Sequence, residues 1–330
     1  MRISLSLSII ILVSQPTIAN CQVLENFKAH VEFLASDRLE GRGPGSRGLQ
    51  LSAEYIVQQF EDLGLQPLNE KSYYQKFTIP GQEVIEANVI GIIPAKTSTH
   101  QSLVFTAHYD GLGIRKDALG VHPNHGEQDS IYNGALDNAV GVAALIEMAR
   151  GYRNKGSQSQ NLVFIATAAE ERGHYGSIFY VNNPAFPLDQ VSINLNIDGF
   201  CIWGKQEEYF MMPQQGIDYV DKIDSIASTQ GWVNNPPDFV DDLNKLFDAT
   251  EFLSRGIPAI TIWSGNKSDV VIPDGQLPLG RRTHTPYDEV NQYWDWGGVE
   301  AQLGLYKLIA DYFLEHPGNV NVTNPELFVH

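Results

Sequence analysis

The stretch Leu103-Val104-Phe105-Thr106-Ala107-His108-Tyr109-Asp110 decides the fold expected for this 330-residue chain. Its first five residues are mainly apolar and of strand length, which predicts a strand buried on both faces, as in parallel sheets. The run then ends in an imidazole and a carboxylate. In open α/β sheets, binding sites form beyond the carboxyl ends of the strands. The stretch therefore predicts both a central strand and a functional site at its end.

Runs of the same kind recur along the chain and alternate with helical patterns. The further predicted strands are 88–93, 162–168, 191–197 and 259–263. The predicted helices are 24–35, 50–63, 138–150, 173–181, 216–229 and 297–314. Such alternation predicts a single-domain, three-layer α/β/α sandwich with a mixed, largely parallel central sheet. We expect one catalytic domain over 20–330, because no repeat or low-complexity linker divides it.

The charge balance disfavours one class of partner. Acidic residues outnumber basic ones by 39 to 22, which gives a formal net charge of −17. A surface of this sign repels phosphate backbones, so we expect no nucleic-acid partner. The hydrophobic fraction of 43% is that of an ordinary folded globule.

Residues 1–19 resemble an export signal, with Arg2, a short apolar stretch and a small-residue cleavage site at Ala19. We therefore expect a periplasmic or extracellular protein. No later segment reaches ~20 apolar residues, so no transmembrane segment is predicted. Cys21 and Cys201 allow a disulfide in an oxidising compartment. Alternatively, Cys21 is the lipidated first residue of a lipoprotein, although Asn20 makes the lipidation motif imperfect.

Other carboxylates and a second imidazole stand at comparable positions. Glu170-Glu171 and Asp198 follow predicted strands, Asp137 lies in a turn before a helix, and His284 lies in a loop. Carboxylates gathered at one sheet edge repel each other and need a cation or protons. Imidazole among the ligands favours zinc. Two imidazoles with several carboxylates suit two metal ions about 3.5–4 Å apart that share a bridging carboxylate.

The adjacent pair Glu170-Glu171 suggests that the two side chains have different roles. On an extended segment, neighbouring side chains point to opposite sides. One glutamate can then bind metal while the other accepts a proton from the metal-bound water. Each motif alone also has an ordinary structural explanation, such as a helix cap for Asp137. Their order along the chain favours the metal site.

These motifs resemble the co-catalytic zinc aminopeptidases of metallopeptidase family twenty-eight in the MH clan, of the bacterial secreted type. The resemblance runs through most of the chain beyond residue 20. The matching segments are 30–42, 107–110, 131–139, 170–173, 256–259 and 284–288. The interval 67–86 is too short for the protease-associated domain that many relatives carry, so we expect none.

The resemblance implies two zinc ions per chain, held by five side chains. Asp137 bridges both ions, His108 and Asp198 complete one site, and Glu171 and His284 complete the other. Glu170 is then the general base that takes a proton from the zinc-bridging water and passes it to the departing amine. Asp110 is expected to hold the His108 ring. The implied substrate is a peptide with a free N-terminus, trimmed from that end.

Three positions depart from the family pattern. Leu136 and Val140 replace more polar residues around the bridging aspartate, and Ala249 stands where the family often has histidine. None of the three carries an implied ligand, so the zinc site is not in question. Because Ala249 replaces this histidine, we expect a contact that sets substrate specificity to be missing.

Other activities of the same fold stay open. A glutaminyl-peptide cyclase shares many of these ligands. A dipeptidase or carboxypeptidase needs a cation for the substrate's terminal carboxylate, which Arg255, Arg281 or Arg282 can supply. A non-catalytic binding protein is disfavoured, because every implied ligand and the base are of a competent residue type. The sequence leaves the oligomeric state open.

Overall fold

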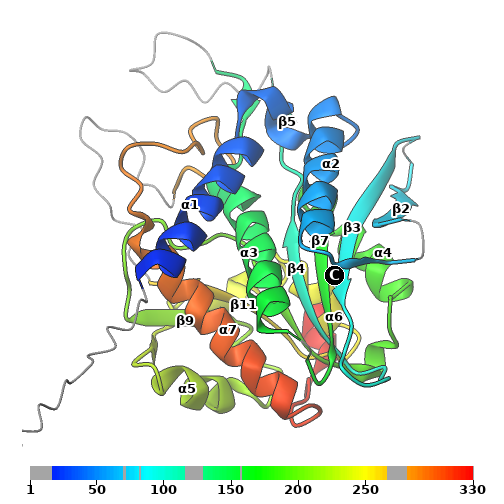
Figure 1. The fold of residues 1–330 in the computed structure, drawn as a ribbon, viewed down its shortest axis with the longest axis vertical. Coiled ribbons are helices and arrows are strands. Elements are labelled where there is room, and N and C mark those ends of the chain that lie inside the picture. The colour runs from blue at the N-terminus through cyan, green and yellow to red at the C-terminus, as the bar shows by residue number, and fades with distance from the viewer. Residues whose placement is uncertain are drawn as a thin grey trace, which may run out of the picture.

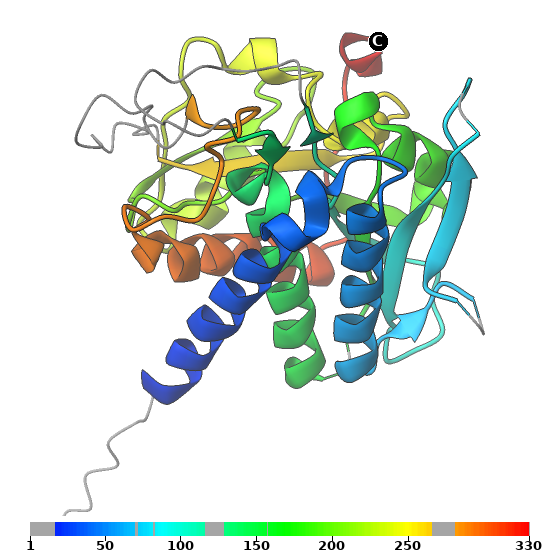
Figure 2. The ribbon, with the colours of Figure 1, turned by 90° about the horizontal axis from the view of Figure 1, so that it is seen from above.

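The computed structural model describes residues 17–69, 72–81, 83–115, 129–156, 158–265 and 281–329. It shows three layers, with a mixed sheet between two sets of helices (Figures 1 and 2). The helices α1, α2, α3 and α7 cover one face of the sheet, and α4 and α6 cover the other. The predicted fold class is confirmed.

The sheet has nine strands in the order β1-β3-β7-β4-β8-β11-β9-β10, and β2 pairs with β3 at one side. Its strands are β1 (Gln66–Pro67), β2 (Tyr74–Thr78), β3 (Ile85–Ile93), β4 (Ser102–His108), β7 (Asn161–Thr167), β8 (Val191–Asn196), β9 (Glu208–Met212), β10 (Val233–Asn234) and β11 (Ala259–Ser264). The four central strands β7, β4, β8 and β11 are mutually parallel. β3 and β9 flank them and run antiparallel to their central neighbours. A separate pair, β5 (Gly113–Ile114) and β6 (Ile131–Tyr132), lies outside the sheet.

The helices connect and cover these strands. They are α1 (Thr17–Leu34), α2 (Arg47–Asp62), α3 (Val140–Lys155), α4 (Tyr175–Asn182), α5 (Val220–Ser228), α6 (Ala249–Leu253) and α7 (Val299–Glu315). Short turns η1 (Asp37–Arg42), η2 (Ala135–Ala139) and η3 (Glu170–Arg172) lie close to the sheet edge where β4 and β7 end. The side chain of Ser46 caps α2 by accepting a hydrogen bond from Leu49 N at 3.0 Å.

Alternation along the central strands divides the core in two. In β4, Phe105 packs in the larger hydrophobic cluster under α1, α2, α3 and α7, where it stacks on Phe164 of β7 at 5.0 Å between ring centroids. The neighbouring Val104 points to the other face, in the cluster that contains Tyr180 and Phe252. Every residue of β4, β7 and β8 is buried. The prediction of strands buried on both faces is confirmed for these three.

The structure extends the predicted elements and adds others. All five predicted strands are present, whereas β2, β9, the two-residue strands β1, β5, β6 and β10 and the short helix α6 were not predicted. The predicted export signal lies mostly outside the described residues, and Thr17 already begins α1. Cys201 is buried and carries a free thiol, and the side chain of Cys21 lies outside the described residues. Across the described ranges, no helix is both long and apolar enough to cross a bilayer.

Close backbone packing between α2 and η1 yields a stability prediction. A Cβ atom on Gly48 would lie 1.7 Å from the carbonyl oxygen of Leu39, whereas one on Gly151 in α3 would meet nothing within 4 Å. Gly48→Ala should therefore lower the free energy of unfolding by about 2 kcal/mol or more. Gly151→Ala, the matched control, should raise it by up to about 1 kcal/mol, because alanine is the better helix former. Urea unfolding measures both, and a Gly48→Ala variant as stable as the parent would contradict the packing described here.

Candidate metal centre

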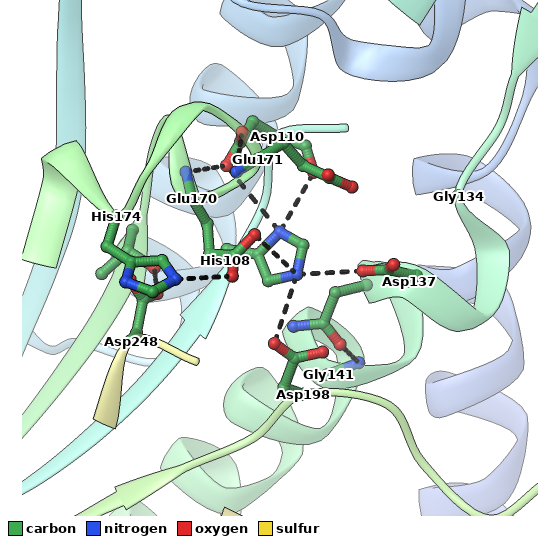
Figure 3. A network of polar contacts seen from close by, with 12 residues as sticks. His108, Asp110, Gly134, Asp137, Gly141, Glu170, Glu171, His174, Asp198 and Asp248 are labelled. Carbon is green, nitrogen blue, oxygen red and sulfur yellow. Dashed lines mark hydrogen bonds and ion pairs between the residues drawn. The ribbon is translucent and has the colours of Figure 1, made fainter. Parts of the chain in front are cut away.

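Three parallel strands deliver polar side chains to one edge of the sheet. His108 is the last residue of β4, Asp198 lies two residues beyond the end of β8, and Glu170 three beyond the end of β7. The ring of His108 lies at the centre of the cluster, with Asp137, Asp198 and Glu170 around it (Figure 3). The convergence expected from strand order is what the structure shows.

Asp137 stands between two imidazoles. Its Oδ1 lies 3.1 Å from Nε2 of His108, and its Oδ2 lies 3.0 Å from Nε2 of His284. Each imidazole has a second acid of its own, Asp198 at 3.5 Å from His108 and Glu171 at 3.4 Å from His284. The donor atoms within each three-residue group all lie within 4.8 Å of one another. Two potential metal-binding groups therefore share Asp137.

The donor set fits a borderline metal such as zinc. Nitrogen and carboxylate oxygen are both present in each group, and three protein ligands leave a position open for water or substrate. Nε2 of His108 is buried and makes no well-aligned hydrogen bond within the part of the chain that the structure describes. A buried nitrogen that faces carboxylate oxygens without such a bond is suited to ligate a cation.

The two groups differ in their access to solvent. The His108 side chain is only 1% exposed, whereas that of His284 is 62% exposed. A small hollow beside His284 is lined by Leu112, Tyr132 and Thr285 together with Asp137 and Glu171. The Asp137–Glu171–His284 group is therefore the side from which a ligand can enter.

Burial and mutual repulsion shift the acids strongly. Burial raises the pKa of Asp110 to about 7 and that of Glu170 to about 8, although the nearby His108 opposes both shifts. The pKa of His108 rises well above its usual value, because Glu170 and Asp198 outweigh the opposing effect of burial. Contact with Asp137 and then Glu171 raises the pKa of His284 to about 10. The raised pKa values mean that the cluster holds protons near neutral pH, and bound cations would replace them.

The Glu170-Glu171 pair lies on a tight turn. The expectation of an extended segment is wrong, because Ala169 takes a left-handed conformation at φ 59° and starts η3. The two side chains still part, and Glu171 reaches His284 while Glu170 Oε2 lies 4.0 Å from His108 Nε2. The turn is held by the Asp110 carboxylate, which accepts hydrogen bonds from Glu170 N at 3.1 Å and Glu171 N at 3.3 Å.

Asp110 therefore contacts the His108 ring less directly than expected. Its carboxylate Oδ1 lies 3.8 Å from Nδ1 of His108, and its backbone oxygen lies nearer, at 3.3 Å. The carboxylate is fully buried and its stronger contacts go to the backbone of η3. Its position links the end of β4 to the turn that carries the two glutamates.

Residues that the sequence analysis did not single out as site residues hold the loop of Asp137. The carboxylate of Asp288 accepts hydrogen bonds from Leu136 N at 2.8 Å and from Asp137 N at 3.0 Å, and so ties this loop to the one carrying His284. The side-chain oxygen of Asn138 accepts bonds from Gly141 N and Gly199 N, both at 3.0 Å, and so ties it to the Asp198 loop. Both residues lie inside quoted motifs, which is the signal that marks them.

Arg42 is a buried cation beneath the site. Its guanidinium donates to backbone oxygens of Tyr109 at 2.9 Å, Asn133 at 2.6 Å and Gly134 at 2.9 Å, and also to Leu34. It thus joins the end of α1 to both ligand loops. Burial lowers its pKa to about 10, while the surrounding acids favour the charged form. These contacts give a structural reason for the presence of Arg42 at the end of the motif 30–42.

Comparison with known proteins places the chain in a family. The profile of Peptidase family M28 matches residues 88–304, about two thirds of the chain, and this span contains both metal-binding groups. The chain belongs to peptidase family M28. The family match agrees with the resemblance found in the sequence motifs.

Solved structures show the same fold as this M28 chain. A zinc aminopeptidase from Bacillus subtilis superposes with a TM-score of 0.66 at 16% identity, over 88% of this chain and 95% of that one. A glutaminyl cyclase from Porphyromonas gingivalis has a TM-score of 0.63 at 16% identity, over 88% of this chain and 97% of that one. The two neighbours differ in activity, so the likeness concerns the fold.

A curated relative matches part of this M28 chain. The alkaline phosphatase isozyme conversion protein of Escherichia coli K12 is 28% identical over 148 residues. The match spans 42% of this chain and 40% of the relative, so less than half of the relative's length is covered.

The protonated cluster predicts how stability changes with pH when no metal is bound. Burial raises the folded-state pKa of Asp110 and Asp288 to about 7 and that of Glu170 to about 8, whereas unfolded carboxyls titrate near 4. The folded chain therefore holds more protons than the unfolded chain between these values, and its stability falls as pH rises. His284, with a raised pKa, acts in the same direction above pH ~6.5.

Urea unfolding of chelator-treated protein should show a loss of about 2 kcal/mol or more between pH 5 and pH 9. The loss should shrink when zinc is added, since the cation takes over the role of the protons. Stability that rises across this range without metal would contradict the electrostatics described for the cluster.

Proposed function

We propose that this M28 chain is a zinc-dependent aminopeptidase that holds two zinc ions and hydrolyses the N-terminal peptide bond of its substrates. One observation carries the proposal. Asp137 presents one carboxylate oxygen to each of two imidazoles, and each imidazole has a separate acid beside it. A carboxylate shared in this way is the bridging ligand that paired metal sites need.

Each ion would have three protein ligands. His108, Asp137 and Asp198 form the deep group, and Asp137, Glu171 and His284 form the open one. When bound, two zinc ions would polarise the scissile carbonyl and lower the pKa of the attacking water. The chain's own contribution is to fix these ligands through Asp288, Asn138 and Arg42, whose hydrogen bonds reach the loops that carry them.

Glu170 is proposed as the general base. It belongs to neither metal-binding group, yet its Oε2 lies 4.0 Å from His108 Nε2, beside the space between the ligands. Burial raises its pKa to about 8, and neighbouring positive charge lowers the pKa of such a group toward the range in which it accepts a proton near neutral pH. In the proposed reaction, Glu170 takes a proton from the attacking water and gives it to the departing amine.

The surroundings favour recognition of a free amine. The carboxylates of Asp137 and Glu171 border the exposed side of the site, where a protonated or metal-polarised α-amine finds acceptors. Recognition of a C-terminal carboxylate needs a cation directed at the site. Arg255 instead contacts Glu251 at 3.4 Å and Asn182 at 3.2 Å. This engagement removes Arg255, one of the three arginines considered for that role, from the candidates.

Glutaminyl-peptide cyclase is the second candidate, because a cyclase of Porphyromonas gingivalis shares the fold. The two activities differ in metal requirement, since cyclase activity typically needs one zinc ion. The presence of two complete groups around Asp137 supports the hydrolase. Export belongs to the same proposal, with Cys21 as the candidate site of a lipid anchor, and it would place the enzyme outside the cytoplasm.

A peptide panel tests the activity. We expect release of the first residue from leucine-led peptides, no release from the same peptides after N-acetylation, and loss of activity with a chelator that zinc restores. Metal analysis of the restored protein should give two zinc ions per chain. Equal cleavage of acetylated peptides would contradict the aminopeptidase. Ring closure on glutamine-led peptides without release from leucine-led ones would identify the cyclase instead.

The base is tested by Glu170→Gln, which keeps the side-chain shape and removes the ability to accept a proton. Loss of general base catalysis should lower kcat by about 10²–10⁴-fold. Zinc content should stay at the parent value, since Glu170 is in neither metal-binding group. Unchanged peptide hydrolysis would remove Glu170 from the mechanism.

A further inference from the structure

A buried imidazole lies on the far side of Glu170 from the metal ligands. The side chain of His174 is only 8% exposed, and its Nε2 lies 3.4 Å from Oε1 of Glu170. Its Nδ1 lies 3.5 Å from Oε1 of Glu251. In Figure 3 the ring stands beside Glu170, opposite His108, with Asp248 below it. The two oxygens of Glu170 thus face two different histidines, Oε1 toward His174 and Oε2 toward His108.

The backbone of His174 takes a conformation that is uncommon for a residue other than glycine. The residue takes a left-handed conformation, with φ 58° and ψ 27°, at the start of α4. Glycine or asparagine adopts this conformation more easily than most residues with larger side chains. A residue held in such a region often marks a functional site.

Side chains on the side of the His174 ring away from Glu170 fix its orientation. Oε1 of Glu251 lies 3.5 Å from Nδ1 of His174, and its Oε2 lies 3.4 Å from Nη1 of Arg255. Asp248 is buried nearby and is held by hydrogen bonds from Thr167 and from Ser177 Oγ, the latter at 2.5 Å. Ser177 Oγ also lies 3.0 Å from the backbone oxygen of His174. The ring is therefore held by Glu251, which is itself paired with the partly exposed Arg255.

The charge on the ring follows from the same contacts. Burial alone would lower the pKa of His174, but the contacts with Glu170 and Glu251 outweigh it and raise the pKa to about 10. At neutral pH the ring is an imidazolium, and both of its nitrogens are donors. Its Nε2–H then has an acceptor in Oε1 of Glu170, which lies 3.4 Å away.

We infer that His174 is a positioning residue that holds Oε1 of Glu170 and thereby keeps Oε2 directed at the space between the metal ligands. This inference rests on the proposed function, in which Glu170 is the base. A carboxylate free to rotate spends less time in the geometry that proton transfer requires. His174 does not touch the reacting atoms, so its loss should lower kcat and leave KM and zinc content close to their parent values.

Two substitutions separate this role from a purely structural one. The amide nitrogen of glutamine reaches about as far as Nε2 of histidine, whereas that of asparagine reaches only about as far as Nδ1. Asparagine suits the left-handed backbone better than glutamine does. A role in the turn therefore predicts that His174→Asn is the better-tolerated change. A role in holding Glu170 predicts the reverse for activity.

The experiment measures kcat and KM on a leucine-led peptide, zinc content and the thermal midpoint for the parent, His174→Gln and His174→Asn. We expect His174→Asn to lose about 10-fold or more in kcat with little change in KM, zinc content or thermal midpoint. We expect His174→Gln to stay within about 3-fold of the parent. A kcat for His174→Asn equal to or above that of His174→Gln would overturn the inference.

A double-mutant cycle provides a second measurement. If His174 acts through Glu170, then His174→Asn should cause no further loss of kcat in the Glu170→Gln background. An additive loss would show that His174 acts elsewhere and would overturn the inference. An active parent whose His174→Asn variant is unimpaired contradicts this inference alone. A parent without peptide hydrolysis overturns the proposed function as well.

Discussion

Mutual repulsion among buried carboxylates is the constraint on which this structure depends. Asp110, Asp137, Glu170, Glu171 and Asp198 gather at one edge of the sheet. Without compensation such a cluster would oppose folding, because charged groups removed from water need partners. The chain supplies imidazoles on both sides and the guanidinium of Arg42 beneath. The negative charge that these groups leave uncompensated requires bound cations. The arrangement of the ligands follows from that requirement.

The fold meets this constraint by joining segments that are far apart in sequence. Arg42 comes from the turn after α1, yet it donates to the carbonyl oxygens of Tyr109 and Gly134. Asp288 binds the backbone of the Asp137 loop from a distance of 151 positions. Because each of these contacts crosses between elements, the ligands are placed by the packed core and not by any one loop. A rigid placement of this kind suits catalysis by preorganised groups.

The central strands were predictable because they are buried on both faces, so their sequence is almost continuously apolar. The edge strand β2 lacks that signal, because its buried and exposed residues alternate, and it was missed. β9 was missed although four of its five residues are buried, because it is short and follows no helical segment. The convergence of His108, Asp137, Glu171, Asp198 and His284 followed from strand order and the family motifs. The tight turn at Glu170 did not, because it depends on the left-handed Ala169 and on the distant carboxylate of Asp110. Arg42 was not predicted as a partner because its contacts are distant in sequence. The contact of His174 with Glu170 spans only four residues, but it depends on the left-handed turns at Ala169 and His174.

The central claim is that Asp137 bridges two metal ions. Anomalous diffraction from zinc-soaked crystals, recorded on both sides of the zinc absorption edge, tests it directly. If Asp137 is the bridging ligand, the map should show two peaks about 3.5–4 Å apart, one between His108 and Asp198 and one between Glu171 and His284, with Asp137 in contact with both. A single peak, or a pair of which one lies away from Asp137, would contradict it.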